Sequence, residues 1–215
     1  MTKKLITITA FAILLTGVIA FSRRHVSTVH SHPQLKIGFT TEFNLTQNGR
    51  LYATSVRYTK SNGEFLEDTN YLNPDGSSAR HAKLAGTIDH GAVVIDDANQ
   101  KLKRAGGAIL LHDTTEAEIR AKGSVDREEL LLGYKVVVQR HCVNQECAEF
   151  WLAPDLGGAP LKFDVLAANG DRKTQVATSI TIGEPSFVVP SYPIDTSIQD
   201  RMQQLRQAQR GQTPQ

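Results

Sequence analysis

The sequence is poor in cysteine and in net charge, and each shortage removes a class of function. Among 215 residues there are two cysteines, Cys142 and Cys147, and a single tryptophan, Trp151. Neither cysteine lies near the hydrophobic N-terminal run, so the residue that carries a bacterial lipoprotein anchor is missing there. Two sulfurs alone do not form a zinc site, and their spacing differs from that of thioredoxin-like redox sites.

Charge and motif content exclude further classes. Lys and Arg total 24 against 22 for Asp and Glu, a formal charge of +2, which does not suggest a nucleic-acid partner. No Gly-x-Ser-x-Gly elbow accompanies adjacent pairs such as His112-Asp113, which we interpret as solvated charges at turns. Asp96-Asp97 lacks the distant bidentate glutamate of a calcium loop. We therefore predict a protein that is not an enzyme, with no catalytic residue, no metal and no cofactor.

The N-terminus is typical of an export signal. Two lysines, Lys3 and Lys4, precede an uncharged apolar run over residues 5–21. The small residues that end at Ala20 favour cleavage there, and the alternative is retention of residues 5–21 as an inner-membrane anchor. We expect a signal or anchor over 1–20, a linker over 21–34, a β domain over 35–193 and a polar, partly helical tail over 194–215. The protein is then periplasmic or secreted, and it contacts a membrane only through an uncleaved N-terminus.

Export also bears on the two cysteines. In an oxidising compartment, Cys142 and Cys147 can close the tip of a hairpin, because four residues separate them. The sequence therefore predicts a disulfide between them.

Alternating apolar and polar residues predict an antiparallel β protein. Ile37, Phe39, Thr41, Phe43 and Leu45 share one phase of a half-buried strand, and Asn48-Gly49 is typical of a two-residue hairpin turn. Turn residues then recur about every ten positions, which indicates a meandering sheet. The further strands are expected at 50–60, 64–72, 79–88, 91–95, 101–104, 130–138, 149–153, 160–168 and 172–182. One mid-chain helix is expected at 114–122, capped by Asp113 or Thr114, and the proline-rich segment after Gly183 should lie extended over the sheet.

Several turn and packing motifs resemble a known family. They are Leu132-Gly133-Tyr134-Lys135-Val136, the run from Trp151 to Gly157, Pro160-Leu161-Lys162, and the run from Ser179 to Pro185. Together they resemble the C-terminal half of LolA/LolB-like exported bacterial envelope proteins, and the likeness extends over residues 37–192. It implies a mainly β fold, with about ten meandering strands in one antiparallel curved sheet, an open half-barrel with one or two short helices. In the carriers of this family the concave face holds lipoprotein acyl chains.

Two functional hypotheses remain open. The first is non-catalytic binding of an apolar, acyl or lipid-like ligand in the concave face of the sheet. The side chains expected to contact it are Phe39, Phe43, Tyr52, Tyr58, Trp151 and Phe163. The second is an interaction or sensor module of the envelope, which binds a protein partner and has a filled core without a ligand.

Overall fold

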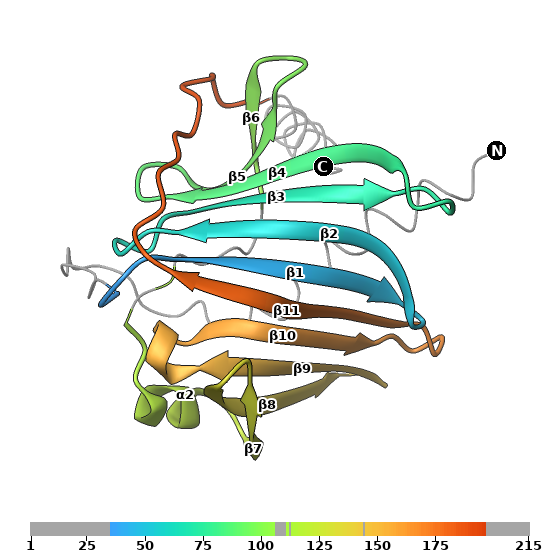
Figure 1. The fold of residues 1–215 in the computed structure, drawn as a ribbon, viewed down its shortest axis with the longest axis vertical. Helices are drawn as coiled ribbons and strands as arrows, with labels where there is room; N and C mark the ends of the chain where they lie inside the picture. The colour runs from blue at the N-terminus through green and yellow to red at the C-terminus, as the bar shows by residue number, and fades with distance from the viewer. Residues whose placement is uncertain (1–34, 106–110, 112, 144, 197–215) are drawn as a thin grey trace, which may run out of the picture.

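The computed structural model describes residues 35–105, 111, 113–143 and 145–196. These residues form eleven antiparallel strands in one sheet, in the order β6-β5-β4-β3-β2-β1-β11-β10-β9-β8-β7 (Figure 1). The strands are β1 (Phe39–Gln47), β2 (Arg50–Thr59), β3 (Phe65–Leu72), β4 (Ser78–Thr87), β5 (Gly91–Asp96), β6 (Lys101–Arg104), β7 (Val125–Leu131), β8 (Tyr134–Val143), β9 (Glu146–Ala153), β10 (Ala159–Leu166) and β11 (Arg172–Ile182). The expected leader, the linker and the tail beyond residue 196 lie outside the described residues. The expected fold class, a single open antiparallel sheet, is confirmed.

The sheet has two arms that meet at its centre. Strand β1 pairs with β11, which comes from the other end of the described chain. From this central pair, β1 to β6 meander to one edge, and β7 to β11 fill the other half (Figure 1). The chain between β6 and β7 must therefore cross from one edge to the other. On that path Leu111 packs against the central core, and helix α2 (Glu116–Lys122) contacts β8.

The turns hold the two arms in register. Asn48 and Gly49 have φ angles of 52° and 79°, as expected for the hairpin between β1 and β2. The amide of Asn48 donates to Asp171 at 2.9 Å, and its side-chain oxygen accepts from the backbone N–H of Arg172 at 2.8 Å. The first turn of the chain is thereby tied to the turn between β10 and β11.

The prediction of one strand over residues 130–138 is wrong. The structure has two strands there, β7 and β8, joined at Leu132 and Gly133, whose φ angles are 52° and 82°. A run of leucines at this point conceals a tight turn, because leucine seldom adopts positive φ. Strand β7 is rich in charge and forms an edge of the sheet, where such residues discourage pairing with other chains.

The expected helix is present and begins slightly later than predicted. Its N-cap is Thr115, whose hydroxyl accepts from the Glu118 backbone N–H at 3.3 Å. The Glu118 carboxylate in turn accepts from the Thr115 N–H at 2.8 Å, which completes a capping box. Ile119 is the buried residue of this helix, and its side of the helix faces the sheet.

Two apolar clusters stabilise the described part of the chain. The central core consists of Leu35, Phe39, Phe43, Leu45, Ala53, Val136, Val138, Trp151, Ala153, Leu156, Ala159, Leu161 and Ala177. The smaller one, Ala85, Val93, Ile95 and Leu102, is covered by residues of the C-terminal strap, our name for residues 183–196. Figure 1 shows the strap running past the ends of the strands toward β6, where Leu102 donates its N–H to the Pro193 carbonyl at 3.0 Å. The proline-rich segment was expected to lie over the sheet, but it passes the strand ends and joins β6 through a parallel bridge between Leu102 and Ile194.

Candidate functional site on the inner face

Strand register defines the two faces of the central sheet. On β1, Phe39, Thr41, Phe43 and Leu45 point to one side, which we call the inner face, and the residues between them point to the outer face. Directly paired residues of neighbouring strands share a face. The inner face therefore continues onto β2 and β3 through Ala53, Ser55, Arg57, Thr59, Phe65, Glu67, Thr69 and Tyr71.

Most of this face is buried, and half of its side chains are apolar. Phe39, Phe43 and Phe65 are 2%, 4% and 0% exposed. Among the described residues the one α-helix, α2, lies against β8 rather than over β1 to β3. The phenylalanines of the inner face are therefore shielded from solvent, and the described helix is not what covers them.

A charged pair lies among the buried side chains of this face. Arg57 on β2 is paired across the strands with Glu67 on β3, and its Nε lies 3.6 Å from Glu67 Oε2. The two side chains are only 17% and 14% exposed. The second oxygen of Glu67 accepts from the Ser55 hydroxyl at 3.1 Å. An ion pair this far from water loses much of its solvation, so it needs either a compensating structure or a function.

Two polar atoms at this centre have no hydrogen-bond partner among the described residues. They are Nε of Arg57 and the hydroxyl oxygen of Thr59, both shielded from solvent. Arg57 and Thr59 lie two positions apart on β2 and so share the inner face. A buried donor left unpaired costs about 1–3 kcal/mol, and native proteins contain few of them. We call Arg57, Glu67 and Thr59 the polar centre.

Phe65 fixes the position of the guanidinium group. The Arg57 guanidinium carbon lies 4.0 Å from the centroid of the Phe65 ring, a cation–π contact. The ring also lies against Gly86 of β4, where a Cβ would stand only 2.2 Å from the ring edge. Glycine at this position lets the ring approach the backbone, so Arg57 is supported by a well-packed neighbour.

The six side chains expected to bind a ligand do not all lie together. Phe39 and Phe43 are on the inner face of β1. Phe163 is paired with Gln175, which is paired with Leu45, so it shares that face. It contacts another ring of the same face, Phe150, at a centroid distance of 4.8 Å.

Tyr52 and Tyr58 are placed differently from these three. Tyr58 is paired with Thr40 and belongs to the outer face. Tyr52 adjoins the register shift between β1 and β2, and its ring lies 6.3 Å from that of Tyr71. Burial, together with the neighbouring Tyr71, raises the pKa of Tyr52 to about 12, so its hydroxyl stays neutral.

Trp151 belongs to the outer face. It is paired with Lys162, which is paired with Val176. Val176 is paired with Asn44, whose side is opposite to that of the inner phenylalanines. The central core therefore draws on both faces, since it contains Trp151 as well as Phe39.

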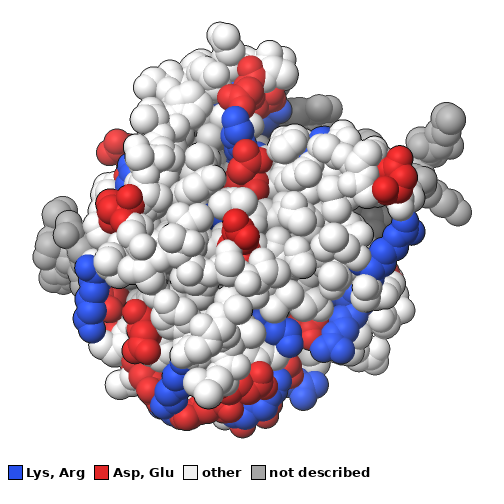
Figure 2. All heavy atoms as spheres, viewed as in Figure 1, with Lys and Arg blue, Asp and Glu red and all other residues white. Residues whose placement is uncertain are grey.

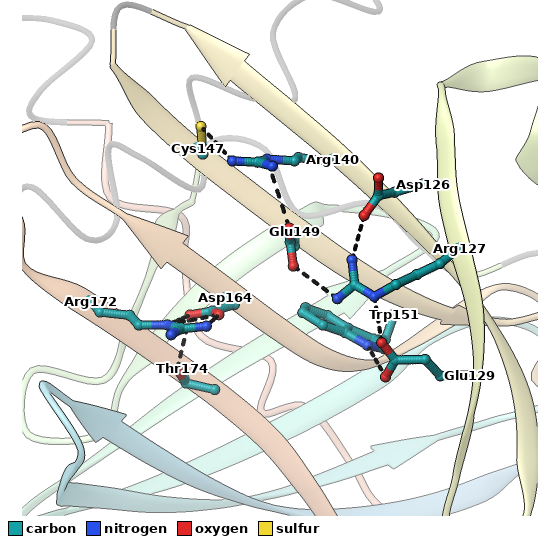
Figure 3. Close-up of polar contacts among 10 residues, drawn as sticks. All are labelled: Asp126, Arg127, Glu129, Arg140, Cys147, Glu149, Trp151, Asp164, Arg172 and Thr174. Atoms are coloured by element: carbon teal, nitrogen blue, oxygen red, sulfur yellow. Dashed lines mark hydrogen bonds and ion pairs between the residues drawn. The ribbon is translucent and has the colours of Figure 1, made fainter.

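A charged network surrounds Trp151 (Figure 3). Its indole N–H donates to Glu129 at 2.9 Å, and the ammonium of Lys162 lies 4.0 Å from the ring centroid. Arg127 donates to Glu129 at 2.6 Å and contacts the carboxylates of Asp126 and Glu149. The hydrogen bonds from Arg127 and Trp151 hold the pKa of Glu129 below its usual range. The indole N–H of Trp151 is hydrogen-bonded and only 2% of the residue is exposed. Trp151 therefore acts as a packing residue of the half of the sheet formed by β7 to β11.

Further pairs extend this network across β9 to β11. Asp164 is 6% exposed and accepts from the Arg172 guanidinium and from the Thr174 hydroxyl (Figure 3). Burial alone would raise the pKa of Asp164, but these hydrogen bonds outweigh it and hold the pKa below its usual range. Figure 2 shows Lys, Arg, Asp and Glu interleaved over the lower part of the molecule, around α2 and β7 to β9. These charges neutralise one another rather than forming a field of one sign.

The predicted disulfide is confirmed. Cys142 and Cys147 are directly paired on β8 and β9, with their Cα atoms 4.1 Å apart, and are bonded through their sulfurs. The bond closes the tip of the hairpin that carries Trp151. No group of three or more potential metal ligands occurs among the described residues.

A cleft of about 430 Å³ lies between the strap and the ends of the central strands. Its walls include Lys60, Glu64, His90, Phe187 and Tyr192. Lys60 is held 3.7 Å from Glu64 and lies over the Phe187 ring at 4.3 Å. These polar groups already contact one another. We therefore interpret the cleft as the packing interface between the strap and the sheet, not as a ligand site.

The sequence carried one signal that points to the polar centre. Within the strand that begins at Arg50, Arg57 falls in the same phase as the buried Ala53 and Ser55. A charged residue in the inward phase of an amphipathic strand marks either a salt bridge or a binding site. The sequence prediction considered only aromatic side chains as ligand contacts and therefore missed Arg57.

Comparison with known proteins gives similarity of fold. No family model matches the sequence, and no curated protein matches it. Solved structures similar to this chain include PNGF-II in two crystal forms, with TM-scores of 0.47 and 0.46 and identities of 14% and 13%. Both similarities cover 77% of this chain but only 32% and 33% of the PNGF-II chains, so this chain spans about a third of their length.

Two shorter proteins are matched over nearly their whole length. A LolA superfamily protein from Nitrosomonas europaea has a TM-score of 0.34 and 10% identity, covering 81% of this chain and 94% of that chain. A putative lipoprotein from Parabacteroides distasonis has a TM-score of 0.36 and 9% identity, covering 73% of this chain and 100% of that one. A LolA superfamily protein is therefore among the solved structures similar to this chain.

Proposed function

We propose that this chain is an exported, non-catalytic binding protein that holds an apolar, acyl-type ligand along the inner face of its sheet. The observation that carries the proposal is the composition of that face. Three buried phenylalanines, Phe39, Phe43 and Phe65, share the face with the Arg57–Glu67 pair. The Nε of Arg57 has no hydrogen-bond partner among the described residues. A curved open sheet needs side chains or a ligand to fill its concave side.

Five of the six residues expected from the sequence divide between the two faces, and Tyr52 lies at the register shift between β1 and β2. Phe39, Phe43 and Phe163 lie on the inner face and are kept as ligand contacts. Trp151 and Tyr58 lie on the outer face, so they serve as references. The basic and apolar pattern of the N-terminal sequence supports the proposal of export. No described helix has the length and apolarity to cross a membrane.

Two measurements test the function directly. The chain is purified from a bacterial envelope, and native mass spectrometry looks for co-purifying lipid. A fluorescent fatty-acid probe is then titrated into delipidated protein. We expect a bound lipid of defined mass and a saturable probe signal, because contact with the apolar side chains of the inner face would remove the acyl chain from water.

A matched pair of variants separates the two faces. Phe43→Leu trims the inner face, and Tyr58→Leu trims the outer face of the neighbouring strand. We expect the first to weaken the probe several-fold and the second to leave it within about twofold. The proposal is lost if no lipid co-purifies and no probe binds. A stoichiometric envelope protein recovered in place of lipid would favour the interaction-module hypothesis.

A further inference from the structure

We propose that Arg57 and Thr59 recognise an uncharged carbonyl group of the ligand, the ester or amide of an acyl chain, in preference to a free carboxylate. This assignment rests on the proposed function and names the chemical class of its ligand. The polar centre supplies the argument in three steps: which donors are unused, how the charge is balanced, and how firmly the groups are held.

The unused groups match a carbonyl oxygen. The Arg57 Nε–H and the Thr59 hydroxyl are buried without a hydrogen-bond partner among the described residues. Glu67 Oε2 lies 3.6 Å from Nε, beyond hydrogen-bond distance. Arg57 and Thr59 both belong to the inner face of β2. An N–H donates, and a hydroxyl can donate or accept. A carbonyl oxygen accepts two hydrogen bonds, so a single ester or amide carbonyl can satisfy both groups.

Charge balance selects the neutral form of the ligand. Glu67 lies 3.6 Å from Arg57 Nε and already compensates the guanidinium charge, while its other oxygen accepts from Ser55. An ionised carboxylate would add a second negative charge beside Glu67, where both side chains are less than one-fifth exposed. Burying an unbalanced charge is far more costly than burying a hydrogen-bonded neutral group. The pair therefore presents a donor without presenting a net positive charge.

The guanidinium is held in place before a ligand arrives. It stacks on Phe65 at 4.0 Å, and Phe65 lies directly against Gly86. A donor fixed in this way loses little side-chain entropy when a ligand binds. It also cannot rearrange to suit different ligand groups, so it favours a carbonyl placed at one position.

The test uses three probes that share one chain length: dodecanoate at pH 8, methyl dodecanoate and dodecane. Each displaces a fluorescent acyl probe from the delipidated protein. We expect the ester to bind about tenfold tighter than the ionised acid and tighter than the hydrocarbon. Arg57→Met keeps the packing of the stem and removes the donor, so it should erase the preference for the ester.

Glu67→Gln provides the diagnostic reversal. It leaves the guanidinium charge uncompensated, so dodecanoate should gain affinity relative to the ester. A protein that merely packs around an arginine would not change its preference in this direction. Arg80→Met is the matched control, since the Arg80 guanidinium stacks in the same manner, 4.3 Å from Tyr71, at an exposed position.

Folding is checked separately. Should Arg57→Met unfold the chain by stranding Glu67, the double variant R57M/E67Q keeps the face neutral and carries the same test. Equal binding of all three probes, unchanged in R57M, would overturn the carbonyl assignment and leave the acyl-binding function standing. A preference for dodecanoate in the wild type would also overturn it. Binding of none of the three would remove the function itself.

Discussion

Gly86→Ala tests the packing on which the polar centre depends. The new methyl group would stand 2.2 Å from one carbon of the Phe65 ring and 2.7 Å from the next, whereas ordinary contacts begin at 3.4 Å. The ring would have to move by more than 1 Å, and it is completely buried, with the Arg57 guanidinium on its face. Overpacking of this kind costs about 1–3 kcal/mol.

A second effect of the substitution reduces the expected loss of stability. Gly86 does not have a positive φ angle, so alanine fits its backbone and stabilises the folded state by about 0.4–1 kcal/mol through the unfolded chain. The net destabilisation should therefore be about 1–2 kcal/mol. With a urea m-value of about 2 kcal/mol/M, the unfolding midpoint should fall by about 0.5–1 M.

Urea unfolding followed by tryptophan fluorescence measures this directly, because Trp151 is the single tryptophan and is buried. Phe65→Leu is the partner variant, since a smaller side chain makes room for the methyl group. The double variant should be more stable than the sum of the single effects, with a coupling of about 0.5–3 kcal/mol. A stable Gly86→Ala protein, or an absence of coupling, would refute the packing argument. Gly86→Ala should also weaken the ester preference, because a displaced ring moves Arg57.

Three further predictions concern other parts of the fold. Thr115→Ala removes the capping box and should destabilise the helix by about 1 kcal/mol, seen as faster amide exchange at Ile119, with Thr115→Ser as the control. Folding lowers the pKa of Asp164 from its ordinary value of 3.8, so the ionised carboxylate stabilises the folded state above that pH and this stabilisation is lost as the pH falls below it. Asp164→Asn should therefore reduce the loss of stability on acidification, measured as the free energy of unfolding against pH. An unchanged acid limb of that curve would contradict this. Replacing Cys142 and Cys147 by serine should lower the free energy of unfolding by about 2 kcal/mol in non-reducing buffer, and dithiothreitol should lower wild-type stability equally.

Local signals in the sequence were sufficient for most of the strands. The pattern of Phe39 to Leu45, the Asn48-Gly49 turn and the hairpin closed by Cys142 and Cys147 all appear where they were expected. These features depend on side-chain alternation and turn chemistry, which act over a few residues. The error at Leu132-Gly133 has the same origin, because an apolar residue stood in a turn where the local pattern predicts a strand.

The arrangement of the strands depends on pairings that the local pattern does not reveal. Strand β1 meets β11, so that Phe39 lies beside Ile182 at the centre of the sheet. No feature near either residue indicates the other, since contacts this distant in sequence are set by how the whole sheet closes its core. The expectation of a meander was correct within each arm, and the central pair and the crossover had to come from the structure.

The same limit explains why the ligand set was only partly coherent. Register shifts occur where β1 meets β11 and where β9 meets β10, and each shift changes which side chains share a face on either side of it. Aromatic content therefore grouped Trp151 with Phe39, although register places them on opposite faces. Arg57 is identified by the reverse reasoning. It is a charged residue in an inward phase, and its Nε finds no hydrogen-bond partner among the described residues, so the binding hypothesis depends on a polar group rather than on the rings around it.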